Sequence, residues 1–99
     1  MNYIRWNCHG LGQARAVLEL IEMVKKQSPT IIFLMETRSE ESFLKNLRSK
    51  LRLDNVHIVP RLNIGGGLAL YWKKGIDLHV LDSSPSLIDV VINPGVDDT

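Results

Sequence analysis

Two polar side chains, Asn7 and Glu36, each stand at the end of a short apolar segment of the chain. Open α/β sheets gather their ligands beyond the ends of such strands. A carboxylate there could hold a hard cation such as Mg²⁺, usually with only one or two protein ligands. If the two segments are adjacent parallel strands, the Asn7 amide lies beside Glu36 and could orient it or hold a phosphate. The plain alternatives are a solvated loop carboxylate and a turn asparagine before Gly10.

The other reactive side chains form weaker patterns. Cys8 and His9 are neighbours, so in a strand they point to opposite faces and cannot readily share a proton as nucleophile and base. No second cysteine or paired histidine gives zinc-ligand spacing, which makes a zinc site improbable. Residues 65–67 are Gly-Gly-Gly without the Lys-Ser/Thr of a phosphate-binding loop, and they predict a hairpin turn. Three aromatic residues could stack on bases but are more commonly packed in strands: Trp6, Tyr71 and Trp72.

Basic residues are concentrated in the first half of the chain, although the formal net charge is only +1. Residues 1–53 hold nine Lys or Arg and five Asp or Glu, a net +4, whereas residues 54–99 hold three and six, a net −3. Most of the local excess comes from four residues: Lys45, Arg48, Lys50 and Arg52. Such a run is usually the solvated face of a helix. The alternative is a surface that binds the phosphates of a nucleic acid.

The first 36 residues predict a strand–helix–strand unit. A strand at 4–8 runs into a glycine-containing turn, and a helix covers about 14–26, where apolar residues share one face: Val17, Leu20, Ile21 and Val24. Pro29 forbids continuation of this helix. Residues 30–35 are a continuous apolar run too short for a helix, which predicts a strand buried on both faces. The two strands are expected to be parallel, with a right-handed crossover.

A second helix is predicted after these strands, capped by Thr37 or Ser39, with an apolar face of Phe43, Leu44, Leu47 and Leu51. The rest alternates as strands do, in four segments at 55–60, 68–72, 76–80 and 87–92. Residues 93–99 are expected to fray. The predicted fold class is therefore α/β (α+β layered), a mixed β-sheet with helices on one face.

Composition restricts the class of protein further. A chain of 99 residues, 44% hydrophobic and 23% charged, is typical of one globular domain. No apolar run is long enough to span a membrane, and the start turns polar too early for a signal peptide. The single cysteine cannot form an internal disulfide, which fits a reducing, intracellular compartment.

Three blocks of the sequence look like successive parts of one known domain. They are Ile-Arg-Trp-Asn-Cys-His-Gly-Leu-Gly at 4–12, Pro-Thr-Ile-Ile-Phe-Leu-Met-Glu-Thr at 29–37 and Gly-Gly-Gly-Leu-Ala-Leu-Tyr-Trp-Lys at 65–73. Their order and spacing resemble the N-terminal half of the endonuclease/exonuclease/phosphatase superfamily, the DNase I-like fold. The likeness is closest to the endonuclease domain of plant LINE-type (non-LTR) retrotransposons. It covers residues 3–92 and implies about half of a four-layer sandwich.

The resemblance implies a Mg²⁺-dependent hydrolase that nicks DNA, with Asn7 and Glu36 at catalytic positions and Glu36 as the metal ligand. His9 stands where family members often have Arg, a departure that could weaken contact with nucleic acid. The family's second half supplies a Tyr, an Asp-x-Asn segment and a closing Asp-His pair, which this chain lacks. A truncated domain with a weak, largely hydrated Mg²⁺ site, catalytically incomplete alone, is therefore expected. Nuclear residence would follow if the family's role on DNA is retained.

The sheet face opposite the helices is expected to need a cover. Five strands of five residues, about 4.8 Å apart, present roughly 400 Å² of sheet face, which rivals the largest apolar patch on a typical monomer. A partner chain or self-association is therefore expected. Two other interpretations remain open: an interaction module that binds another protein or completes a split nuclease, and a non-catalytic nucleic-acid binder that uses the four basic residues at 45–52.

Overall fold

The computed structural model describes residues 2–62 and 65–93, and it has the α+β layered architecture that the sequence predicts. Within this part of the chain the elements follow one another as β1 (Tyr3–Asn7), α1 (Ala14–Gln27), β2 (Ile31–Met35), α2 (Glu41–Lys50), β3 (Asn55–Val59), β4 (Leu68–Trp72), β5 (Asp77–Ser84) and β6 (Leu87–Asn93). The predicted fraying of 93–99 falls mainly on 94–99, outside the described residues, and Asn93 itself closes β6. No described helix has the length and apolar character needed to cross a membrane.

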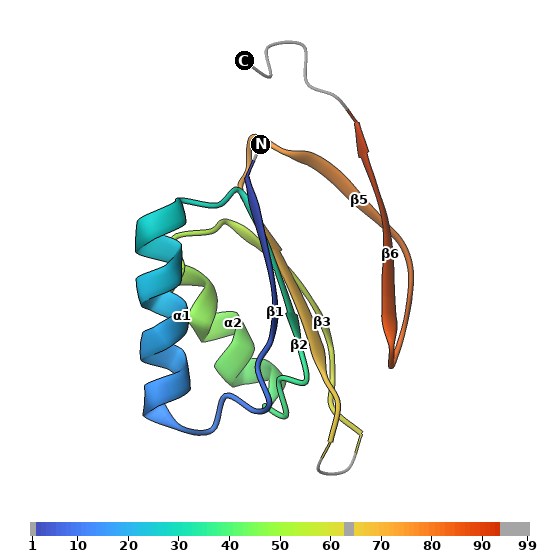
Figure 1. Cartoon of the computed structure of the whole chain (residues 1–99). Coiled ribbons are helices and arrows are strands. Elements are labelled where there is room, and N and C mark those ends of the chain that lie inside the picture. Colours follow the sequence, from blue (N-terminus) through green and yellow to red (C-terminus); the bar gives the residue numbers. More distant parts are fainter. Residues whose placement is uncertain (1, 63–64, 94–99) are drawn as a thin grey trace.

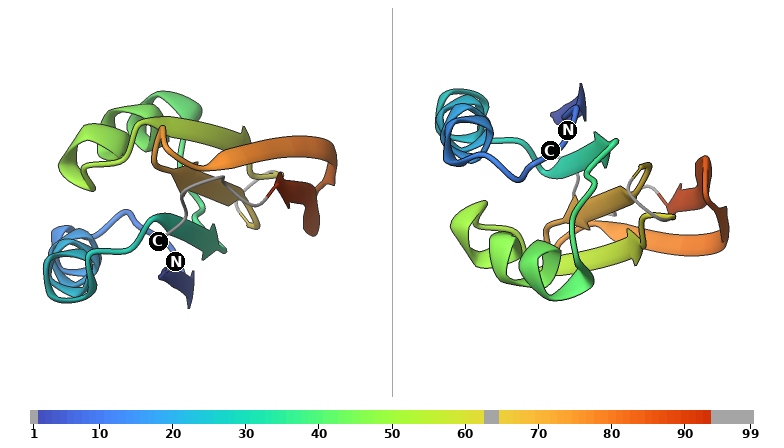
Figure 2. Two further views of the ribbon diagram at one scale, coloured as in Figure 1. Left: turned by 90° about the horizontal axis from the view of Figure 1, so that it is seen from above. Right: turned by 90° about the horizontal axis from the view of Figure 1, so that it is seen from below.

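The main sheet has four strands in the order β1-β2-β4-β3. β1 and β2 are parallel, whereas β4 runs antiparallel to both of its neighbours, so the sheet is mixed as expected. Both helices lie on one face of this sheet (Figure 1). Seen along the strands, α1 lies alongside β1 and β2, and α2 lies alongside β3 (Figure 2). The strand–helix–strand unit predicted in the first 36 residues is confirmed, with parallel strands and bounds that differ from the predicted ones by one residue.

The central strand β2 is buried on both faces, as its unbroken apolar run predicts. Ile32 and Leu34 are fully buried in the core beneath the helices. Ile31 points to the opposite face, where it packs with Leu70 and Leu78 in a second, smaller core. Alternate residues of one five-residue strand thus serve two separate hydrophobic clusters.

The last two strands leave the main sheet, which corrects the expectation of five strands in one sheet. β5 and β6 form an antiparallel hairpin that lies across the face opposite the helices (Figure 1). Leu78 of β5 is 7% exposed there, and His57 Nε2 lies 3.4 Å from Ser83 Oγ, which links β3 to β5. The chain therefore covers part of this face itself.

Two details of α2 differ from the sequence prediction. Neither Thr37 nor Ser39 caps the helix: its N-cap is Glu40, and the Ser39 hydroxyl donates instead to the Thr37 carbonyl over 2.7 Å. Phe43 is 38% exposed, so it lies outside the core although it follows the apolar spacing. The other predicted core residues of this helix and its end are buried: Leu44, Leu47 and Leu51.

Candidate functional site

Three loops meet at the carboxyl ends of β1 and β2 and the start of β4. The segment after β2 is held on one side by the Gly10 amide, which donates to the Glu36 carbonyl over 2.8 Å. On its other side, the Thr37 amide donates to the Gly67 carbonyl over 3.1 Å, and the Arg38 amide donates to the Gly66 carbonyl over 2.9 Å. We call these segments, residues 8–11, 36–38 and 66–67, the three-loop junction.

The backbone of the junction adopts left-handed conformations at several positions. Three of them are not glycines: His9 (φ 51°), Glu36 (φ 53°) and Arg38 (φ 48°). Each such residue costs on the order of 1–3 kcal/mol and persists only where its surroundings hold it. The hydrogen bonds between the loops provide that support. Clusters of strained backbone residues occur at ligand and active sites. The backbone conformation therefore indicates the same candidate site as Asn7 and Glu36 do.

Asn7 and Glu36 emerge at this junction from neighbouring strands. Asn7 is directly opposite Met35 in the parallel pairing, one position before Glu36. Asn7 is exposed, and its Oδ1 accepts a hydrogen bond from the His9 amide over 3.2 Å, so it also forms the local turn. Glu36 is half-buried, and its Oε1 lies 3.4 Å from Nη2 of Arg38. The structure therefore brings both predicted residues to one edge of the sheet, with Arg38 beside them.

Thr37 and Gly67 form the tightest contact of the junction. The Thr37 side chain is fully buried, and its Oγ1 has no hydrogen-bond partner among the described residues. Gly67 (φ 98°) lies against it so closely that a Cβ on this glycine would overlap Oγ1. Sequence reasoning assigned Thr37 to a helix cap and the glycines to a turn. It missed this contact, because no local pattern relates residues 30 positions apart.

The oxygen atoms of Asn7 and Glu36 at the junction are of the type that Mg²⁺ prefers, but they are few. Carboxylate and amide oxygens are the hard ligands that Mg²⁺ prefers, and it commonly takes only one or two carboxylates from a protein. The described residues contain no group of three or more His, Cys, Asp or Glu placed to hold a metal ion. Glu36 would thus be the protein's carboxylate ligand, with water or phosphate completing the shell, and Arg38 would have to yield its contact with Oε1.

Cys8 and His9 do not form a catalytic pair. The Cys8 thiol is 6% exposed, and burial raises its pKa to about 12, so it remains protonated near neutral pH. His9 is exposed in the turn after β1. β1 ends at Asn7, so the two are not alternating strand residues as predicted; they differ because the Cys8 thiol is part of the core whereas His9, with φ 51°, lies in the exposed turn.

The four basic residues predicted as a nucleic-acid surface divide into different environments. Lys45 Nζ pairs with Glu41 at 3.0 Å, and Arg48 Nη1 donates to the Asp54 carbonyl over 3.3 Å. Lys50 and Arg52 instead line a cavity at the far end of the main sheet. Two of the four are thus engaged with neighbouring groups, and the other two line the cavity.

A scan against models of known protein families finds no match to this chain, and a search of curated proteins finds no significant similarity.

Proposed function

We propose that this chain forms part of an endonuclease-like phosphodiesterase domain with a Mg²⁺ site at the three-loop junction. The observation that carries this proposal is the parallel, in-register pairing of β1 and β2, through which Asn7 and Glu36 leave the same sheet edge at neighbouring positions. Except for Arg38, which directly follows the second block, the residues of the junction also fall within the three blocks that resemble the family, at 4–12, 29–37 and 65–73. Segments that resemble one domain in sequence thus meet at one place in space.

In this proposal each junction residue has a distinct task. Glu36 holds the cation through its carboxylate, and the exposed Asn7 amide orients either that carboxylate or a phosphate oxygen. Arg38, 46% exposed at its side chain, supplies a positive charge to the same phosphate once it leaves Glu36. Bound Mg²⁺ would supply polarisation of a phosphoryl oxygen. The left-handed backbone at 36 and 38 keeps these side chains on one rigid segment.

Hydrolysis also needs an activated water and a partner for the leaving group. The junction residues provide one carboxylate, one amide and one guanidinium, and the buried Cys8 cannot act as a nucleophile. Catalysis by this chain alone is therefore expected to be absent, and metal binding is expected to be weak. Retroelement ancestry and action on DNA belong to the same proposal.

The experiment that tests the site is a titration of the ¹⁵N-labelled protein with Mn²⁺ as a paramagnetic stand-in for Mg²⁺. Amide signals of residues 7–10 and 36–38 should broaden first, and excess Mg²⁺ should restore them. Glu36→Gln should abolish this effect. Glu41→Gln, which removes an exposed carboxylate already paired with Lys45, is the matched control and should leave it intact. Equal broadening in Glu36→Gln and the native protein would overturn the metal site.

A plasmid-nicking assay tests the expectation that the domain is incomplete. Supercoiled DNA incubated with the protein and Mg²⁺ should be nicked no faster than with Glu36→Gln. Mg²⁺-dependent nicking that Glu36→Gln abolishes would instead show a working nuclease. It would contradict the expectation that this chain has no catalytic activity on its own.

An interaction module is the second candidate function, favoured by apolar side chains that the fold leaves exposed. Tyr3 on β1 is 68% exposed, and on the hairpin Leu81 is 63% and Leu87 60% exposed. Scattered apolar residues are ordinary, but these lie on strands at sheet edges, where pairing with another chain is favourable. Size-exclusion chromatography with light scattering tests this candidate: a stable, compact monomer at high concentration would count against a partner or self-association.

A further inference from the structure

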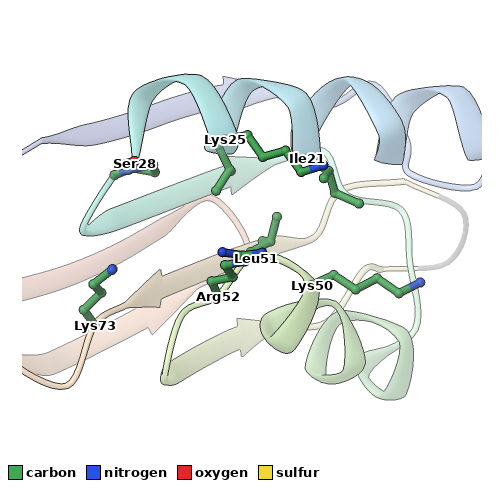
Figure 3. Close-up of a pocket in the computed structure, with 9 residues that line it drawn as sticks. Ile21, Lys25, Ser28, Lys50, Leu51, Arg52 and Lys73 are labelled. Atoms are coloured by element: carbon green, nitrogen blue, oxygen red, sulfur yellow. The ribbon is translucent and has the colours of Figure 1, made fainter.

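A cavity of about 430 Å³ lies at the end of the main sheet opposite the three-loop junction. It opens between the carboxyl-terminal ends of α1 and α2 and the end of β4 (Figure 3). Its apolar wall includes Ile21 from α1 and Leu51 from the end of α2, which point toward one another in Figure 3. The five residues of β2 separate this cavity from Glu36 by at least about 13 Å.

Cationic side chains surround the opening. Lys25, Lys50, Arg52 and Lys73 all line the cavity, and no carboxylate does. None of the four lies within ion-pair distance of a carboxylate among residues 2–62 and 65–93, whereas Lys45 on the same helix as Lys50 is paired. The nearest carboxylate in the chain, Asp54, accepts a hydrogen bond from the Lys74 amide over 2.9 Å. Like charges that form no ion pair of their own repel one another, and an anion in the cavity would relieve this repulsion.

The helix dipoles explain the placement of only two of these four cationic residues. Lys25 and Lys50 stand in the last turns of α1 and α2, where positive charge is favourable. Arg52 and Lys73 lie outside both helices, so the dipoles do not explain their placement. In Figure 3 Lys73 extends toward the opening from the end of β4, whereas Lys50 extends away from it. The ligand contacts are therefore expected from Lys25, Arg52 and Lys73.

Arg52 is held in place by its backbone. Its amide donates to the Ser49 carbonyl over 3.1 Å, and the Leu53 amide donates to the Arg48 carbonyl over 3.2 Å. These two bonds form a Schellman motif, in which the residue with left-handed backbone is usually glycine. Here it is Arg52, with φ 60°. The chain thus places a cation at a position where glycine would be less strained, directly beside the cavity.

We propose that this cavity binds a nucleoside di- or triphosphate. Its volume lies within the range of small-ligand sites. Lys25, Arg52 and Lys73 would contact the phosphates, and the flat base would lie against the half-buried Ile21. A small molecule is favoured over a nucleic-acid strand because the cations surround one concave opening. Two basic residues that could extend them into a track, Lys45 and Arg48, are engaged with Glu41 and the Asp54 carbonyl.

The test is calorimetric and NMR titration of the full chain with ATP in the presence of EDTA. Amide signals of 21–28, 50–53 and 73 should shift. Lys25→Gln, Arg52→Gly and Lys73→Gln should each weaken binding about tenfold, the loss of one hydrogen bond to a charged group. Arg52→Gly relieves backbone strain, so its loss of binding cannot be ascribed to unfolding. Lys74→Gln, which changes the neighbouring exposed lysine outside the cavity, should bind ATP within about twofold of the native protein.

Two further probes separate the contributions of base and phosphate. Tripolyphosphate should bind more weakly than ATP because it leaves the apolar wall uncovered, and adenosine more weakly still. A loss in Lys74→Gln as large as that in Lys73→Gln would overturn the site. A single-stranded oligonucleotide could bind more tightly than ATP and lose affinity in the same variants. That result would overturn the proposal of a nucleotide ligand and assign the cavity to nucleic acid. Glu36→Gln should leave ATP binding unchanged, because Glu36 lies at the other end of the main sheet. The nucleotide site and the metal site can therefore be tested, and disproved, separately.

Discussion

Gly67 and Thr37 are in contact across the three-loop junction: the Thr37 amide donates to the Gly67 carbonyl over 3.1 Å, and Thr37 Oγ1 occupies the space that a Cβ on Gly67 would need. This contact joins the start of β4 to the segment that carries Glu36. The position of the candidate metal ligand is thus set by a glycine that follows it by 31 residues.

Gly67→Ala should destabilise the fold by about 2–4 kcal/mol, because alanine is strained at φ 98° and its Cβ would displace the fully buried Thr37. Urea unfolding followed by circular dichroism measures this loss. Gly65→Ala is the matched control, since a Cβ there meets nothing within 4 Å, and it should change stability by less than about 0.5 kcal/mol. Equal stability of the two variants would contradict the contact.

Arg52→Gly should stabilise the protein by about 0.5–1 kcal/mol, because glycine adopts the left-handed backbone of the Schellman motif without strain. The midpoint of urea unfolding should rise. Lys45→Gly, which also replaces a basic residue by glycine but in the interior of α2, should lower stability by about 1 kcal/mol. A fall in the midpoint for both variants would show that the Arg52 side chain stabilises the fold more than its backbone strains it.

Tyr71→Phe should cost about 1 kcal/mol. The fully buried Tyr71 hydroxyl donates to the Leu44 carbonyl over 2.8 Å and so ties β4 to α2. The ring remains, so the packing of the core should be preserved and only the hydrogen bond lost. Thermal unfolding measures the change. Loss of several kcal/mol would mean that the hydroxyl supports more of the helix position than one hydrogen bond provides.

Stability should fall as the pH rises from about 9 to 12. Burial raises the pKa of the Cys8 thiol from 9.0 to about 12 in the folded state, so the unfolded chain loses this proton first. Below pH 9 the thiol is neutral in both states and its contribution is complete; above that pH, ionisation favours the unfolded chain until the folded pKa is reached. Burial also raises the pKa of Tyr71, which adds to the effect at the alkaline end.

Cys8→Ala should show a shallower decline of the unfolding midpoint over this pH range, whatever its stability at pH 7. The native thiol should also react slowly with iodoacetamide at pH 8 and rapidly once urea unfolds the chain. Fast alkylation of the folded protein would show that Cys8 is accessible and would remove the basis of the pH prediction.

Leu78→Ala should loosen the β5–β6 hairpin from the main sheet, because Leu78 packs on Ile31 and Leu70. A buried leucine truncated to alanine commonly costs about 2–5 kcal/mol. Hydrogen exchange should accelerate in residues 77–93 more than in β1 or β2. Uniform acceleration across the chain would instead mean that the hairpin and main sheet unfold as one unit.

Local periodicity predicted β1, α1 and β2 because each has its own apolar pattern with a clear stop, such as Pro29 after α1. The same reasoning placed Asn7 and Glu36 at one edge, since parallel neighbours bring their carboxyl ends together. Such reasoning failed where the structure of a segment depends on residues far away in the sequence. The alternation of Leu78 and Val80 indicates one buried face but does not specify that this face packs on the main sheet instead of joining it.

The strand order β1-β2-β4-β3 has a consequence for how the chain folds. β4 is the central partner of both β2 and β3, yet it is synthesised after them. A nascent chain that has emerged only as far as Val59 has two helices and three strands, of which β3 has no neighbour to pair with. The sheet therefore cannot assemble in the order of synthesis. Folding of the main sheet must wait for Leu68–Trp72 to enter between strands already made, so these five residues complete most of the strand pairing of that sheet in one late, cooperative step.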